Sequence, residues 1–242
     1  MRDNMPVHYS AEQYDQYTQH SVDVYDAAMI RRILFEDRLQ RRQPRRLLDV
    51  GTGTAQLLVK IAAMPKLQHY ELIGTDFFED MVQQARLTVK RCELDSRITI
   101  EQCDVHALPY RDEFADFVIS RSTIHHWADP AKAFQEIYRV LKPGGIAIIH
   151  EPRRNPHPAA LAEFNRRRSE MGVEPARMDE KYTPAEVREF VNRAGVGKQT
   201  IISAPRRGPK SLGFEVRISK CGPVKMAVTA VIAWCVCCGG TW

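Results

Sequence analysis

The feature that most constrains the fold of this 242-residue chain is an apolar strand that runs directly into a glycine loop and a helix. Residues 47–50 have the pattern of a short buried strand, Gly51 and Gly53 follow at once, and residues 54–64 repeat apolar side chains at helical spacing. Paired glycines allow a sharp turn and a close approach of the backbone to a ligand, and a helix start offers unpaired amides to an anionic or electron-rich group. A lone Gly-x-Gly is common in ordinary turns, so the flanking strand and helix are what favour a binding loop.

Strands and helices alternate along the chain from residue 45 onward, which favours βαβ units. Residues 146–149 are apolar throughout, as expected of a strand in the middle of a sheet that is covered on both faces. We therefore predict an α/β fold with a doubly wound, mostly parallel, seven-stranded sheet of the Rossmann-like type and helices on both faces. The predicted strands span residues 47–50, 70–75, 98–101, 117–120, 146–149, 200–202 and 214–218. The predicted helices span residues 54–64, 79–92, 130–141, 159–171 and 183–194.

The chain divides into a helical N-terminal segment, one domain and an apolar tail. Residues 1–44 carry aromatic and aliphatic side chains at near-helical spacing until Pro44 breaks the pattern. Residues 45–220 form the α/β domain, in which residues 152–182 interrupt the alternation with prolines, arginines and one helix. The apolar stretch of the tail, residues 221–242, is shorter than the roughly 20 residues of a membrane-spanning helix. We expect no membrane span, and a tail that packs on the domain or mediates a homodimer.

The composition, with 44% hydrophobic and 27% charged residues, is ordinary for a globular protein. The six cysteines have neither a disulfide framework nor the paired spacing of a zinc site, so we expect no metal. The first residues contain no apolar secretory segment, which favours a cytoplasmic location. The net charge is +5, and the arginines come in short clusters, which are usual on solvated helix faces and also occur in nucleic-acid-binding proteins.

An acid stands where a nucleoside ligand would need one. Asp76 follows the second predicted strand, 25 residues after Gly51. At the carboxyl edge of a parallel sheet such an acid can accept hydrogen bonds from both hydroxyls of a ribose, whereas the alternative role of a helix cap needs no ligand. A dehydrogenase would share this acid, but its Gly-x-Gly-x-x-Gly pattern requires a third glycine where Gln56 stands.

Five segments, in the correct order, resemble the motifs of the class I S-adenosylmethionine (SAM)-dependent methyltransferases. The resemblance covers about residues 45–145 and extends more loosely to residue 220. Residues 48–55 resemble the first motif, with Ala55 where a third glycine often stands. The other four are Gly74-Thr75-Asp76 followed by Met81, the pair Asp104-Val105, residues 116–120 and residues 139–145. The nearest branch contains ubiquinone and menaquinone methyltransferases and many enzymes of small-molecule biosynthesis.

The resemblance implies SAM as the cofactor. The backbone at Gly51 and Gly53 is expected to pack against its methionine part, and Asp49 to orient the loop or attract the amino group through water. Asp76 is expected to bind the ribose, and Asp104 the adenine amino group. The complete predicted set of cofactor-binding residues is Asp49, Gly51, Thr52, Gly53, Asp76, Phe77, Met81, Asp104, Val105, Ser120 and Arg121.

The methyl acceptor is expected at the end of the fourth strand, where residues 121–127 follow. A histidine there can take a proton from a phenol, an enol or an acidic carbon. His126 is the candidate catalytic residue and His125 the alternate, and purely structural histidines are the competing interpretation. The resemblance also implies that residues 1–44 and 152–182 form a lid. The candidate substrate-binding residues are Tyr14, Tyr17, Arg153 and Arg154, for which packing or a surface role is the alternative.

We therefore predict an enzyme that transfers a methyl group from SAM to a small-molecule acceptor by in-line attack on the sulfonium methyl. An RNA methyltransferase is the alternative that the arginine clusters favour. No separate RNA-binding module and no amino-methylating motif after the fourth strand is visible, so no nucleic-acid partner is expected. A non-catalytic SAM-binding protein is a third hypothesis, which the intact cofactor segments disfavour. The sequence does not distinguish oxygen, nitrogen and carbon as the methylated atom.

Overall fold

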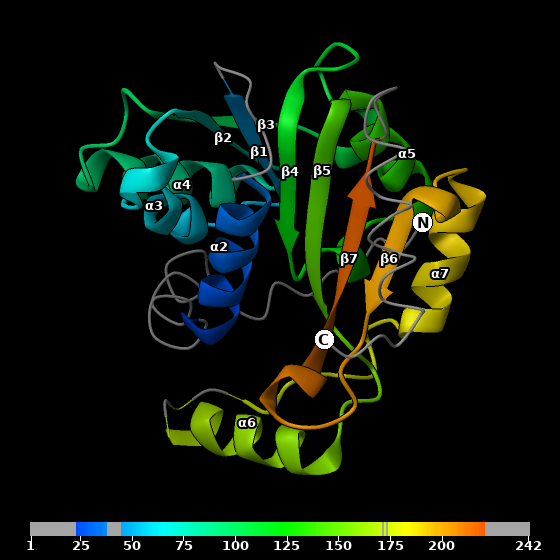
Figure 1. The fold of residues 1–242 in the computed structure, drawn as a ribbon. Helices are drawn as coiled ribbons and strands as arrows, with labels where there is room; N and C mark the ends of the chain where they lie inside the picture. The colour runs from blue at the N-terminus through cyan, green and yellow to red at the C-terminus, as the bar shows by residue number, and fades with distance from the viewer. Residues whose placement is uncertain (1–22, 38–44, 171, 173, 221–242) are drawn as a thin grey trace, which may run out of the picture.

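A single seven-stranded sheet forms the centre of the molecule, in the order β3-β2-β1-β4-β5-β7-β6 (Figure 1). The computed structural model describes residues 23–37, 45–170, 172 and 174–220. The strands are β1 (Arg45–Val50), β2 (Tyr70–Asp76), β3 (Ile98–Gln102), β4 (Ala115–Arg121), β5 (Leu141–Pro152), β6 (Thr200–Ser203) and β7 (Gly213–Ser219). Strands β1 to β5 pair with one another in parallel, and β7 is antiparallel to both β5 and β6. The predicted mostly parallel, seven-stranded sheet is confirmed.

Helices cover both faces of this sheet. They are α2 (Asp23–Asp37), α3 (Gln56–Ala62), α4 (Glu79–Arg91), α5 (Pro130–Val140), α6 (Pro158–Glu170) and α7 (Pro184–Arg193). Successive side chains of a strand point to opposite faces, so the apolar runs of the strands supply two cores. Leu47 and Phe117 pack with α2, α3 and α4, whereas the adjacent Leu48 and Val118 pack with α5 and α7. All four side chains are fully buried, which explains why these strands lack the polar alternation of a one-sided sheet.

Each of the two segments that interrupt or precede the alternation contains one helix among its described residues. The helix predicted at residues 159–171 is α6, and α2 lies within the predicted N-terminal helical segment. In Figure 1, α6 lies beyond the end of the sheet toward which β4 points. The predicted lid role of these helices stays a prediction. The described residues do not include residues 1–22, 38–44 and 221–242. The predicted dimer through the apolar tail therefore stays a prediction.

Within the described part of the chain, no helix is long and apolar enough to cross a membrane. The same residues contain no group of three or more histidine, cysteine or acidic side chains suited to holding a metal ion.

The start of α7 is fixed by a reciprocal pair of hydrogen bonds that the sequence predicts. Thr183 caps the helix, and its Oγ1 accepts a bond from the Glu186 amide at 3.3 Å. The Glu186 carboxylate returns a bond by accepting from the Thr183 amide at 2.7 Å. Pro184 occupies the first turn, where a missing amide hydrogen costs nothing. The helix ends before Gly195, whose φ of +77° suits glycine.

This cap gives the first test of the fold. Replacing Thr183 with alanine is expected to lower the free energy of unfolding by about 1 kcal/mol, because the Glu186 amide loses its acceptor. Thr183→Ser keeps the hydroxyl and should lose much less. Urea denaturation of both variants measures the difference. An equal loss in the two variants would assign the effect to the threonine methyl group and not to the cap.

Candidate active site

The glycine loop after β1 is tied to the end of β2 by two backbone hydrogen bonds. The amides of Gly51 and Thr52 both donate to the Thr75 carbonyl, each at 2.8 Å. Gly51 and Gly53 have φ values of +72° and +56°, in the left-handed region that favours glycine. Ala55, at the start of α3, shares this conformation with a φ of +63°. The loop therefore adopts the tight turn that its glycines predict.

A polar brace from β4 holds the loop on its other side. The Ser120 hydroxyl donates to the Val50 carbonyl at 2.5 Å and lies 2.5 Å from Oγ1 of Thr123. Ser120 is completely buried. Its hydroxyl thus binds the loop backbone, which gives this predicted cofactor residue a structural task that sequence analysis did not identify.

Asp76 joins the end of β2 to the glycine loop. Its Oδ2 accepts a hydrogen bond from the Gly53 amide at 2.9 Å, and its Oδ1 accepts one from the Phe78 amide at 3.1 Å. The residue is only 8% exposed, and burial raises the pKa of its carboxyl group, while the backbone amides oppose that shift. Each carboxylate oxygen has a second lone pair, so both can still accept from a ligand hydroxyl.

Apolar and polar groups suited to a flat heterocycle follow β2 and β3. Phe77 is 60% exposed and meets Phe78 edge-to-face at a centroid distance of 5.4 Å, and the partly buried Met81 lies in α4. After β3, Oδ1 of Asp104 accepts from the amide and from Nδ1 of His106 at 2.9 Å and 2.5 Å.

The contacts of His106 set the direction of the Asp104 carboxylate. Nε2 of His106 accepts from the Asp129 amide at 3.1 Å, so the ring proton resides on Nδ1 and is donated to Asp104. Oδ2 of Asp104 is then the oxygen left for a further donor. Val105, next to it, is buried.

Asp49 is the most perturbed acid of the site. It is 2% exposed, and Oγ1 of Thr52 donates to its Oδ2 at 2.9 Å. Burial raises the pKa of Asp49 to about 7, the negative charges of Asp26 and Asp76 act in the same direction, and the Thr52 bond and Arg121 oppose them. A buried acid with a raised pKa beside a glycine loop is a feature that favours a binding site.

Arg121, at the end of β4, is held by a residue that sequence analysis missed. Its Nε lies 3.2 Å from Oδ1 of Asp26 in α2, and Oδ2 of the same acid bonds Lys60 at 2.8 Å. Asp26 precedes Met29 and Ile33 on the buried stripe of α2. An acid at this spacing, in line with buried apolar residues, is the signal that could have identified it.

The two candidate catalytic histidines have different surroundings. Nδ1 of His125 lies 2.5 Å from Oε1 of Glu151, whose Oε2 accepts from the Ile124 amide at 3.1 Å. Glu151 is 2% exposed. His126 is exposed at the surface and has no carboxylate partner among the described residues. Nearby protein atoms, His125 and Lys181 all lower the pKa of His126, so its ring is neutral at pH 7. The rings of the two histidines lie 3.7 Å apart. Sequence analysis identified neither Glu151 nor Lys181.

The two candidate arginines after β5 have local partners. Arg153 donates to Asn155 at 3.0 Å, and Arg154 donates to the Lys181 carbonyl at 2.9 Å and pairs with Glu186 at 3.0 Å. These contacts support the structural alternative for both. Tyr14 and Tyr17, the other candidate substrate residues, lie outside the described residues.

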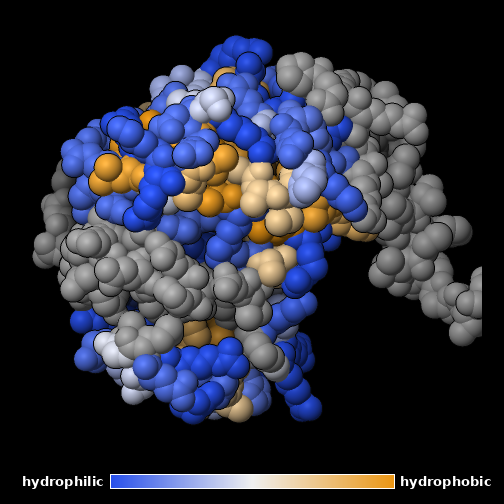
Figure 2. Space-filling view, turned by 90° about the vertical axis from the view of Figure 1, so that its left-hand side faces the viewer, coloured by the Kyte–Doolittle hydropathy of each residue, from blue (hydrophilic) through white to orange (hydrophobic). Residues whose placement is uncertain are grey.

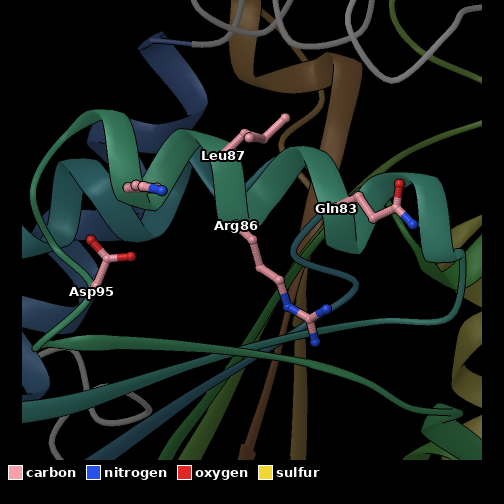
Figure 3. Close-up of a pocket in the computed structure, with 5 residues that line it drawn as sticks. Gln83, Arg86, Leu87 and Asp95 are labelled. Atoms are coloured by element: carbon pink, nitrogen blue, oxygen red, sulfur yellow. The ribbon is translucent and has the colours of Figure 1, made fainter.

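A surface depression on α4 is separate from this site. Figure 2 views the side of the molecule that carries α3 and α4, where a band of apolar side chains runs among hydrophilic ones. The depression is lined by Gln83, Arg86, Leu87, Lys90 and Asp95 (Figure 3). None of the predicted site residues belongs to it.

Comparison with known proteins agrees with this geometry. Residues 48–149 match the family described as a methyltransferase domain. The chain is 33% identical over 150 residues to the demethylmenaquinone methyltransferase of Bacteroides fragilis, covering 58% of this chain and 60% of that protein. It is 37% identical over 106 residues to the ubiquinone/menaquinone biosynthesis C-methyltransferase UbiE of Geobacter sulfurreducens, covering 44% and 41%. The chain thus spans about 60% or less of the length of these two relatives.

A solved structure shares the fold over most of the chain. The putative S-adenosyl-L-methionine-dependent methyltransferase of Methanococcus maripaludis superposes with a TM-score of 0.61 and 24% identity, covering 92% of this chain and 98% of that one. All five sequence segments lie within the residues that match the methyltransferase domain, and the solved structure shows the same fold.

The glycine loop can be tested at Gly51. A β-carbon there would lie 2.5 Å from Cγ2 of Thr123, whose hydroxyl is held by Ser120, and it would add strain at a positive φ. Gly51→Ala is expected to weaken binding of S-adenosylhomocysteine, the SAM product, at least tenfold in calorimetric titration. Gly195→Ala is the control, since it has a similar φ of +77° but nothing within 4 Å. Similar affinity losses in both variants would contradict a local role of Gly51.

The shifted pKa of Asp49 predicts the pH dependence of stability. Between its ordinary value of 3.8 and about 7, the folded chain holds a proton that the unfolded chain releases. The contribution of this group to stability is therefore full below pH 4 and is lost as the pH rises through 7.

Asp49→Asn should remove this dependence. Without ligand, we expect the variant to exceed the parent in free energy of unfolding by at least ~1 kcal/mol at pH 8, and to differ less at pH 5. Urea unfolding at both pH values measures this. The exposed Asp95→Asn is the control and should follow the parent. If the Asp49 variant keeps the parental slope, the group does not titrate in this range.

Proposed function

We propose that the chain, whose residues 48–149 match the family described as a methyltransferase domain, is a class I SAM-dependent methyltransferase that transfers a methyl group from SAM to a small-molecule acceptor. The names of its relatives refer to small organic acceptors, among them that of the 27-O-demethylrifamycin SV methyltransferase of Amycolatopsis mediterranei, 29% identical over 127 residues. These names support a small molecule over a macromolecule. The identity of this chain's acceptor does not follow from these names, because the chain matches only part of each relative.

The residues around the glycine loop fit SAM part by part. The lone pairs that Asp76 retains suit the ribose hydroxyls. Oδ2 of Asp104 and the Val105 amide suit the amino group and ring of adenine, and the exposed Phe77 offers it an apolar face. The close backbone approach at Gly51 suits the methionine part.

The observation that carries the mechanism is the buried pair of Glu151 and His125. A carboxylate that accepts a hydrogen bond from Nδ1–H fixes the imidazole tautomer and leaves Nε2 as the basic nitrogen. The pair stands at the ends of β4 and β5, at the carboxyl edge of the sheet that also carries the glycine loop. We therefore place the base at His125, ahead of His126.

Bound SAM supplies a methyl group that its positive sulfur already activates. The task of the chain is to align the acceptor and to receive the proton that a phenol, enol or acidic carbon loses. Nε2 of His125 takes this proton, and Glu151 stabilises the resulting imidazolium. His126, neutral and adjacent, contributes a wall of the acceptor space.

The proposal as a whole is tested by binding and by transfer. The purified chain is expected to bind S-adenosylhomocysteine and to move a labelled methyl group from SAM to a member of a panel of phenols, quinols and acidic-carbon acceptors. Transfer to bulk RNA without transfer to this panel would overturn the small-molecule acceptor. Absence of S-adenosylhomocysteine binding would contradict the proposal that the chain is a methyltransferase.

The base is tested by substitution. His125→Ala is expected to lower turnover by roughly 10²- to 10⁴-fold while the affinity for S-adenosylhomocysteine stays within about threefold of the parent. Glu151→Gln should lower turnover and shift the acidic limb of the profile of turnover against pH. His126→Asn is the matched control and should have a small effect. Full activity of the His125 variant would exclude it as the base.

A further inference from the structure

Lys181 is a cation at the acceptor end of the site that the proposed function does not yet use. Its side chain is half-buried, and no acid among the described residues forms an ion pair with its ammonium group. Burial lowers the pKa of this group, and the charge of Arg168 acts in the same direction. The carboxylates of Glu151, Glu180 and Asp179 oppose that shift. An ammonium group that is partly removed from water and lacks a counter-ion favours an anion that arrives with a ligand.

The backbone around Lys181 is fixed to the end of β5. The Lys181 carbonyl accepts from Nε of Arg154 at 2.9 Å, and the Tyr182 carbonyl accepts from the Arg154 amide at 3.2 Å. Tyr182 also pairs with Arg153 in an isolated parallel bridge. On the other side, the Lys181 amide donates to the carbonyl of the buried Met178 at 3.2 Å. Lys181 is therefore held beside the last residues of β5, the strand that carries the acid of the proposed catalytic pair.

The charge of Lys181 reaches both sides of the proposed acceptor space. It acts on the Glu151 carboxylate and on the His126 ring. The His126 ring lies 3.7 Å from the ring of His125, the proposed base. An acceptor that meets His125 would therefore come under the influence of the ammonium group of Lys181.

Glu151 does not serve as the counter-ion of Lys181. Both of its oxygens are already bonded, Oε1 to Nδ1 of His125 and Oε2 to a backbone amide. Glu180, which precedes Lys181, pairs instead with Arg177 at 3.4 Å. Under the proposed function, the reacting atom of the acceptor meets Nε2 of His125. The ammonium group of Lys181 is therefore left for a second group of the acceptor.

The charges around Lys181 favour a singly charged anion. The ammonium group offers one positive charge and three donors, which suit a carboxylate. A phosphate group carries close to two negative charges at neutral pH, and the second would be repelled by Glu151. His126 is neutral at pH 7 and adds no positive charge to balance it.

We propose that the methyl acceptor carries a carboxylate group and that Lys181 binds this group while His125 meets the reacting atom. The inference rests on the proposed function and narrows its substrate class to carboxylic acids with a phenol, an enol or an acidic carbon. The ion pair fixes one end of the acceptor, which restricts the orientations of the reacting atom at Nε2 of His125. In this arrangement Lys181 binds substrate and takes no part in proton transfer.

The experiment compares free acids with their methyl esters, which lack the negative charge. Hydroxybenzoates and hydroxycinnamates, each beside its methyl ester, are titrated into the chain saturated with S-adenosylhomocysteine, and calorimetry gives the affinities. At least one acid is expected to bind about tenfold or more tightly than its ester, because it gains a hydrogen bond between charged groups. Lys181→Gln should weaken that acid about tenfold and change the ester less than about twofold. Lys181→Arg keeps the charge and should keep most of the preference.

Arg177→Gln is the matched control, because it removes a positive charge from an exposed position of the same segment. It should leave the preference for the acid unchanged. The proposal is overturned if the parent chain prefers no acid over its ester, if Lys181→Gln keeps the preference, or if Arg177→Gln loses it equally. Equal weakening of acid and ester in the Lys181→Gln variant would overturn it in favour of a structural role, and thermal unfolding verifies that each variant is folded. A parent chain that does not bind S-adenosylhomocysteine contradicts the proposed function instead.

Discussion

The pairing of β1 with β2 is the constraint on which the site depends. Val50 lies opposite Thr75 in this parallel pair, so the chain leaves β1 beside the last carbonyls of β2. The amides of Gly51 and Thr52 can therefore turn onto one acceptor, the Thr75 carbonyl. The same turn presents the Gly53 amide to Asp76. A loop without glycine could not adopt these positive φ values cheaply, and a different strand register would separate the loop from its acid.

Much of the fold could be predicted because the sheet is buried on both faces. Residues 146–149, for example, are uniformly apolar, so pattern alone locates the buried part of β5, although the strand extends from Leu141 to Pro152. The order of the last two strands in the sheet could not be predicted in this way. β7 lies between β5 and β6, and its alternating pattern is compatible with either position. Strand order follows from connections and packing in three dimensions, which local periodicity does not contain.

The residues of the predicted site likewise differ in how far the sequence alone could identify them. Gly51, Gly53 and Asp76 are recognisable because their roles depend on local backbone geometry at strand ends. His125 and His126 are adjacent and chemically identical in the sequence, and only the contact with Glu151, from another strand, distinguishes them. Asp26 pairs with Arg121 from a helix outside the alternating region. Such tertiary partners become visible only when the fold brings distant segments together.

The two halves of the site differ in how well their polar groups are satisfied without ligand. At the acceptor end, both oxygens of Glu151 are bonded, so the His125 pair is complete before an acceptor arrives. At the cofactor end, burial raises the pKa of Asp49, and one oxygen of Asp26 has no donor among the described residues. The fold therefore retains unfavourable electrostatics at the place where we propose that SAM binds. A ligand that relieves them binds the folded state selectively and stabilises it in proportion to the logarithm of its concentration above the dissociation constant. On the proposed function, the His125–Glu151 pair is therefore rigid before the acceptor binds, and the proposed cofactor end is completed by binding.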